Sequence, residues 1–136
     1  MDTDSYMHSL LVANPLREST LRAVIETLQL PSGSCGLDAG CGIGLQCMSL
    51  AKAVGLTGHV TGLDLSSEFL NRGREIVKEA GLSERISFHK GDAANLPFGN
   101  NTFNWAWSAD CVGYGLWEPL PLLKELARVV KPNGIV

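Results

Sequence analysis

The sequence predicts an α/β fold, a doubly wound parallel sheet with helices on both faces, from three observations. Short apolar runs alternate along the chain with stripes of apolar residues at helical spacing. Strands that alternate with helices are joined by right-handed crossovers and therefore lie parallel. Asp38, Asp64 and Asp92 each end one of the expected strands. Because the carboxyl ends of parallel strands share one edge of the sheet, these carboxylates are expected together, at the edge where ligands bind.

The first half of the chain predicts two helices and two strands. Asn14-Pro15 is typical of a helix start, and an apolar stripe at helical spacing follows over 21–28. A strand is expected over 35–38, a helix with an apolar face over 47–54, and a second strand over 59–64. Glycine, proline and serine separate these segments, and these residues favour turns.

The next part of the chain continues the alternation with a third helix and two strands. Ser66 or Ser67 can cap the helix, and Gly81 is suited to end it. Strands are expected over 86–89 and 102–108. The expected apolar face of this helix consists of Phe69, Ile76, Val77 and Ala80.

The last expected helix ends at Pro132, and its apolar stripe is formed by Leu123, Leu126, Ala127 and Val130. Asn133-Gly134 then predicts a turn, and a fifth strand begins at Ile135. An open sheet that stops there has an unpaired edge, which natural domains avoid. The sequence therefore predicts a truncated sheet, or a partner chain such as a second copy that covers this edge.

Composition indicates one domain over 1–136, with an N-terminal helical segment 1–31 and a core 32–136. The chain is 45% hydrophobic and 18% charged, which supports one packed core. No apolar run approaches the roughly 20 residues that cross a bilayer, and the acidic start lacks the basic residues of a signal peptide, which favours the cytoplasm. The net charge is −3 with no block of Lys or Arg, which disfavours nucleic acid as a partner.

The cysteines predict no structural metal site, because they form no Cys-x-x-Cys pair and no histidine stands at finger spacing. In a chain without an export signal, reduced and buried thiols are expected. The four are Cys35, Cys41, Cys47 and Cys111.

A glycine-rich loop over 40–44 lies between the first strand and the next helix. Glycines there permit positive φ and close approach of a ligand, with backbone amides expected to face it; a tight turn without a ligand is the alternative. A dinucleotide fingerprint requires glycine where Leu45 stands, and no P-loop Lys follows. Asp38 would repel a pyrophosphate but suits an ammonium group. The loop therefore favours a nucleoside that carries an amino acid.

The acidic strand ends fit the rest of such a ligand. Asp64 can accept hydrogen bonds from both hydroxyls of a ribose, and Asp92 can accept from an exocyclic amine. Leu65, Ala93 and Leu96 offer apolar walls. A single aspartate after a strand is more often a turn residue, but three at successive strand ends beside a glycine loop indicate a binding site.

Four segments, 37–44, 62–64, 91–98 and 126–134, together resemble class I S-adenosylmethionine-dependent methyltransferases. The stretch at 91–98 is similar to the branch that includes quinone-biosynthesis and other metabolite methyltransferases. The resemblance implies a Rossmann-like sheet, truncated at the start of its fifth strand, with the cofactor across the strand tips. It implies these cofactor-binding residues: Asp38, Gly40, Cys41, Gly42 and Gly44 at the methionine end, Asp64 and Leu65 at the ribose and adenine, Asp92 and Ala93 at the adenine amine, Ser108 beside the methionine part, and Gln46, for which a solvent-facing position is an equal alternative.

The resemblance implies an enzyme that transfers a methyl group from S-adenosylmethionine to a small molecule and releases S-adenosylhomocysteine. Cys111 follows no proline and no Asn-Pro-Pro-Tyr motif occurs, which disfavours a DNA acceptor. The alternatives are a cofactor-binding module without turnover of its own and, more distantly, a nicotinamide oxidoreductase.

No catalytic residue is assigned from the sequence. His8, His59 and His89 are candidates for a general base by residue type alone. The tryptophans at 105, 107 and 117 could face a planar acceptor, although the alternation of the first two along a strand favours the core.

Overall fold

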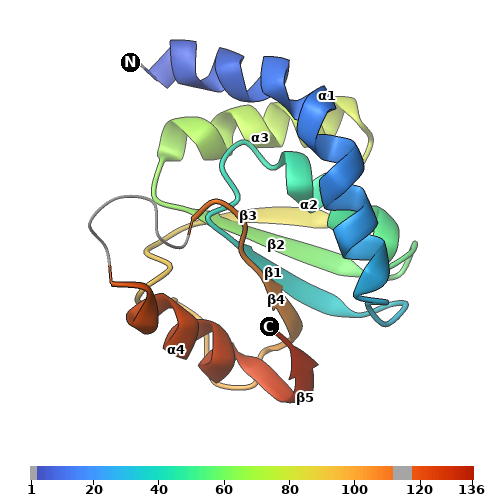
Figure 1. Ribbon diagram of the computed structural model, residues 1–136, viewed down its shortest axis with the longest axis vertical. Helices are drawn as coiled ribbons and strands as arrows, with labels where there is room; N and C mark the ends of the chain where they lie inside the picture. The colour runs from blue at the N-terminus through green and yellow to red at the C-terminus, as the bar shows by residue number, and fades with distance from the viewer. Residues whose placement is uncertain (1–2, 112–117) are drawn as a thin grey trace.

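The computed structural model describes residues 3–111 and 118–136 and confirms the doubly wound parallel sheet. Five strands lie parallel in the order β3-β2-β1-β4-β5 (Figure 1). The chain adds β2 and β3 on one side of β1 and then β4 and β5 on the other, so the switch point of the sheet lies between β1 and β4. The strands are β1 Cys35–Ala39, β2 His59–Asp64, β3 Ile86–Lys90, β4 Phe103–Trp107 and β5 Val130–Ile135. The helices are α1 Thr3–Thr27, α2 Leu45–Ala53, α3 Ser67–Glu79 and α4 Pro119–Val129.

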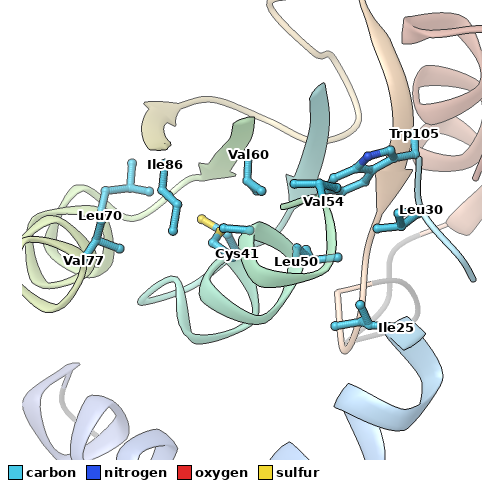
Figure 2. Close-up of a cluster of buried hydrophobic side chains, with 12 residues drawn as sticks. Ile25, Leu30, Cys41, Leu50, Val54, Val60, Leu70, Val77, Ile86 and Trp105 are labelled. Atoms are coloured by element: carbon cyan, nitrogen blue, oxygen red, sulfur yellow. The ribbon is translucent and has the colours of Figure 1, made fainter. Parts of the chain in front are cut away.

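The larger of two apolar cores lies between the sheet and the layer of α1, α2 and α3. Figure 2 shows Val54, the residue that follows α2, beside Trp105 of β4, with Leu50 of α2 and Val60 of β2 in the same cluster. The expected stripe over 47–54 is confirmed, because Cys47, Leu50, Ala51 and Val54 are all fully buried. Trp105 is also buried and donates its indole N–H to Ser34 Oγ at 2.9 Å, which satisfies its polar atom inside the core.

The second core lies on the opposite face, beneath α4. The buried residues of α4 are Leu122, Leu126 and Val129. Of the expected stripe, Leu126 and Val130 are buried, whereas Leu123 and Ala127 are exposed. Both sets have helical spacing, so packing against the sheet decides which of them is buried. The helix ends at Val129, before Pro132, and β5 begins at the next residue.

Helix α1 begins eleven residues earlier than Asn14-Pro15 predicts, at Thr3, and Pro15 lies inside it. Proline costs a helix one hydrogen bond and bends it, and Figure 1 shows α1 as two arms that meet at an angle. The first arm lies beside α3, where the Tyr6 and Phe69 rings are 5.7 Å apart. The second arm packs through Ile25 into the larger core. Tertiary contacts at both ends of α1 therefore outweigh the local signal for a helix start at Asn14-Pro15.

The Ser66 cap is confirmed, since its hydroxyl accepts the Phe69 N–H at 3.2 Å. The buried face of α3 is Leu70, Gly73 and Val77, so the expected face was largely wrong. The turn at Asn133-Gly134 occurs within β5, where Asn133 has φ 66° and the pairing with β4 is irregular.

The cysteines are all free, as expected, but they are not all buried. Cys41 and Cys47 lie in the core, Cys111 is half-buried, and Cys35 at the start of β1 is exposed. The helices within 3–111 and 118–136 include none that is long and apolar enough to cross a membrane. The cytoplasm stays a prediction.

Gly36 of β1 lies directly under the Trp105 ring, and a Cβ at this position would lie 2.1 Å from two of the ring atoms. We expect Gly36→Ala to lower the free energy of unfolding by about 2 kcal/mol or more, because a packed indole cannot move away without strain. Urea denaturation measures the change. Gly99→Ala is the matched control, since its Cβ would meet only Thr102 Oγ1 at 3.7 Å. Equal stability of the two variants would contradict this account of the core.

Candidate cofactor site

A cavity of about 800 Å³ lies at the carboxyl edge of the sheet. One wall consists of the end of β2 and of the loops that follow β1, β2 and β3. The other wall comes from one side of α1, from the loop after β4 and from the start of α4. The cavity therefore occupies the position at which open parallel sheets bind ligands.

Most of the residues that the sequence analysis singled out line this cavity. Those on its wall are Gly40, Cys41, Gly42, Gln46, Asp64, Leu65, Asp92 and Ala93. Asp38, Gly44 and Ser108 are not among the lining residues. Of the three acidic strand ends that were expected together, Asp64 and Asp92 share the wall of this cavity, whereas Asp38 does not line it.

The three glycines of the loop all have positive φ, of 78° at Gly40, 54° at Gly42 and 77° at Gly44. Their surroundings differ. A Cβ at Gly40 would meet Cys111 Sγ at 2.5 Å, and one at Gly44 would meet the Phe88 ring at 2.6 Å. A Cβ at Gly42 would have nothing within 4 Å. Gly42 is therefore the point at which bare backbone faces open space, whereas the other two glycines allow close packing.

The loop amides were expected to face the cavity, but the structure shows that they are bonded within the protein. The N–H groups of Gly40 and Cys41 both bond to Leu63 O, at 2.8 and 3.0 Å, and Gly44 N–H bonds to Cys41 O at 2.9 Å. Gly42 N–H bonds to Asp64 Oδ2 at 2.9 Å. The reason is that β2 lies next to β1 in the sheet, so the end of β2 supplies acceptors directly below the loop.

Asp64 lies at the centre of this arrangement. Its Oδ2 accepts from Gly42 and its Oδ1 accepts the Ser66 N–H at 2.9 Å, so both oxygens are fixed by the backbone. A carboxylate has about four acceptor positions, and Asp64 remains partly exposed on the cavity wall. It can therefore accept two further hydrogen bonds from a ligand in a preset direction.

Asp92 and Leu65 occupy the neighbouring part of the wall. Asp92 Oδ1 accepts the Ala94 N–H at 2.8 Å, which is a turn-residue role, while the side chain stays exposed. Leu65 is 63% exposed although it is large and apolar. An apolar ledge beside a carboxylate acceptor suits a planar base that carries an amine.

A clamp that the sequence analysis missed holds the loop after Asp92. Glu125 of α4 accepts the Leu96 N–H at 2.7 Å, and Arg128 donates to Leu96 O and Phe98 O. Glu125 and Arg128 also pair with each other at 2.7 Å. Their spacing of three residues on a helix was the available signal, although nothing local indicated that the pair reaches another loop.

Asp38 is 2% exposed beneath the glycine loop, and the Cys47 thiol donates to its Oδ2 at 3.2 Å. Burial raises the pKa of this carboxyl from 3.8 to about 7, against a lowering by the Cys47 hydrogen bond, and the nearby Asp64 raises it further. Near neutral pH the group is therefore divided between its neutral and ionised forms.

Gln46 and Ser108 take hydrogen bonds within the protein. Gln46 Oε1 accepts from the Trp107 indole at 2.6 Å, so this residue is fixed on the wall and not free in solvent. Ser108 Oγ donates to Ala39 O at 2.9 Å, and the next three residues line the cavity in its place. Trp105 belongs to the core. Trp117 lies outside the described residues.

The histidines do not line the cavity within the described part of the chain. His8 is exposed on α1. His59 lies 3.0 Å from Ser87 Oγ through its Nε2, and His89 packs edge-on against Phe98. No catalytic role follows for any of them.

Helix α1 supplies a set of lining residues that the sequence analysis did not identify. They recur at helical spacing across the proline: Tyr6, Ser9, Leu10, Ala13, Asn14, Arg17 and Leu21. The spacing was visible in the sequence, but a helix start at Asn14 divided it into two parts.

The fold and the cavity together define a class: a parallel α/β domain with a ligand-sized cavity at the switch point of its sheet. Comparison with known proteins gives the family. The methyltransferase domain family matches residues 37–134, and the chain belongs to it, as the resemblance in its motifs predicted.

Several relatives have curated names. A demethylmenaquinone methyltransferase of Staphylococcus epidermidis is 41% identical over 116 residues, which cover 83% of this chain and 45% of that protein. Its namesake in Staphylococcus aureus is 39% identical over 85% of this chain and 46% of that protein. The chain therefore spans under half the length of these relatives.

Solved structures agree with the fold. A SAM-dependent methyltransferase from Aquifex aeolicus superposes with a TM-score of 0.73 at 33% identity, over 82% of this chain and 58% of that one. A protein of Methanococcus maripaludis reaches 0.84 at 22% identity, over 98% and 63%, which supports the fold alone.

The raised pKa of Asp38 predicts a pH-dependent stability. Between about pH 4 and pH 7 the unfolded chain ionises this group while the folded chain keeps the proton, so the free energy of unfolding falls as pH rises through that window. We expect Asp38→Asn to remove this fall and to exceed the wild type most above pH 7. Urea denaturation across the window measures it.

Glu79→Gln, an exposed change on α3, is the control for the loss of one carboxylate. A stability difference between Asp38→Asn and wild type that stays constant with pH would contradict the assignment.

Proposed function

We propose that this chain binds S-adenosylmethionine in the cavity and takes part in methyl transfer to a small apolar acceptor. The observation that carries the proposal is the arrangement of Gly42, Asp64, Leu65 and Asp92 along one wall. The opposite wall, from α1 and α4, is largely apolar. Family membership favours this proposal over a binding module without turnover.

The residues present fit the adenosine part of the cofactor and leave room for the rest of it. Open backbone at Gly42 leaves room for close approach, and the carboxylate of Asp64 has acceptor capacity for two ribose hydroxyls. Leu65 provides the apolar ledge and Asp92 the acceptor that an adenine requires. When bound, the cofactor supplies an activated methyl group on a sulfonium.

The proposed acceptor is a planar apolar compound of the quinone type. Leu10, Ala13 and Leu21 of α1 face the cavity together with Pro121 and Leu122 of α4, and apolar walls with few polar groups suit such a ring. The relatives that are named demethylmenaquinone methyltransferases point in the same direction.

The contribution of the protein to the reaction is alignment. The strand tips and loops are held by hydrogen bonds such as that from Gly42 N–H to the Asp64 carboxylate, so the residues that would hold the cofactor are themselves fixed. Walls on both sides restrict the approach of the acceptor. Alignment of this kind can supply about 7–11 kcal/mol of the barrier, and a base is required only if the acceptor still carries a proton.

Self-association through the sheet edge, the absence of a nucleic-acid partner and the cytoplasmic location all stay predictions.

Calorimetric titration with S-adenosylhomocysteine tests cofactor binding, with NAD as the negative control. We expect micromolar affinity for the former and none for the latter. Asp64→Ala should weaken binding by more than about tenfold, because a charged hydrogen bond contributes roughly 1.5–3 kcal/mol. Glu79→Ala is the exposed control, and circular dichroism checks the fold. Unchanged affinity in Asp64→Ala would refute the ribose assignment.

Turnover is tested separately with isotopically labelled S-adenosylmethionine and the reduced form of a short-chain demethylmenaquinone, with mass spectrometry of the product. A labelled methyl group on the ring would support the proposed acceptor. Cofactor binding without any label transfer to the quinol would refute it.

A further inference from the structure

The charges on the cavity wall are strongly unequal. Among the lining residues in 3–111 and 118–136, Arg17 of α1 is the only basic one. Four acidic residues share the wall: Asp64, Asp92, Asp110 and Glu118. This inequality suits a ligand that is cationic overall, but it leaves one basic group to be explained.

Arg17 forms an ion pair with Asp110, on the loop that follows β4. The pair joins α1 to that loop, and its side chains are 45% and 49% exposed. Exposed ion pairs contribute little to stability, about 0–1 kcal/mol. Arg17 is therefore held in place on the wall, yet its partner can be exchanged at small cost.

The cofactor of the proposed function carries one anionic group, the carboxylate of its methionine part. The glycine loop does not offer this carboxylate the amides of Gly40, Cys41, Gly42 and Gly44, which are bonded within the protein. The carboxyl group of Asp38 beneath the loop, by contrast, cannot attract an anion. Among the described side chains on the wall, the guanidinium of Arg17 is the one that can pair with a carboxylate, and its planar donors match that group well.

We propose that Arg17 binds the carboxylate of the cofactor, and that Asp110 neutralises Arg17 until the cofactor arrives. The inference rests on the proposed function and deepens it, because it gives α1 a direct part in cofactor recognition. On binding, one carboxylate replaces the other on the same guanidinium, so the basic group is paired in both states.

A purely structural role for the pair is the competing explanation, in which Arg17 only ties α1 to the loop after β4. The two roles differ in what they predict for a ligand that lacks the carboxylate. Decarboxylated S-adenosylmethionine keeps the adenosine, the sulfonium and the amine, and it differs from the cofactor only at the group in question.

The experiment is a calorimetric cycle of two proteins and two ligands. Wild type and Arg17→Gln are each titrated with S-adenosylmethionine and with its decarboxylated form. We expect Arg17→Gln to weaken binding of the complete cofactor by about 10- to 100-fold, and to change binding of the decarboxylated form less than about threefold. Arg17→Lys should restore part of the loss, because it keeps the charge without the planar pair of donors.

Arg22→Gln is the matched control, since Arg22 is an exposed arginine on the same helix that does not line the cavity. It should leave the affinity for both ligands unchanged. Thermal unfolding of each variant shows whether α1 still packs.

The outcomes separate the two proposals. If the wild type binds neither S-adenosylmethionine nor S-adenosylhomocysteine, the proposed function itself fails. If the wild type binds and Arg17→Gln weakens both ligands equally, Arg17 is structural and the inference is overturned. If Arg17→Gln binds both ligands as the wild type does, the carboxylate is held elsewhere, for example by the first amides of α2, and the inference is again overturned.

Discussion

The site depends on one contact between neighbouring strands, the hydrogen bonds that the loop after β1 makes to the end of β2. Leu63 O accepts from two successive amides of that loop, and the next residue, Asp64, accepts from Gly42. These bonds fix the height of the glycine loop above the sheet and the direction of the Asp64 carboxylate in a single step. The position of the glycine loop and the direction of the Asp64 carboxylate therefore depend on each other.

This contact explains why the site residues were largely predictable while their hydrogen bonds were not. Asp64 and Asp92 could be assigned to one edge because strand alternation dictates a parallel sheet, whose carboxyl ends coincide. The bonds of the loop amides depend on which strand lies beside β1. Strand order is a long-range property, and the glycine pattern alone is compatible with amides that face either a ligand or a neighbouring carbonyl.

The start of helix α1 also could not be predicted from local sequence signals. Pro15 is a strong local signal for a helix start, and only contacts far along the chain, such as Tyr6 with Phe69, outweigh it. The phase of α4 was missed for a related reason. Its two possible stripes differ by one residue, and the choice depends on which side chains fit against Leu37 and Phe103 on the sheet. Local periodicity predicts that a helix exists, whereas packing decides which face is buried and where the helix begins.

The carboxylates at and beneath the cavity wall lower the stability of the free protein, but they would favour the binding of a cationic ligand. Asp38 is buried with the Cys47 thiol as a side-chain donor, and burial raises its pKa to about 7, so ionisation is disfavoured there. A cation that arrives nearby would stabilise the ionised form and lower that pKa. Binding of a cationic ligand and ionisation of Asp38 would then favour each other. The same burial that costs stability above neutral pH would therefore favour a positively charged ligand, which an uncharged residue at this position could not do.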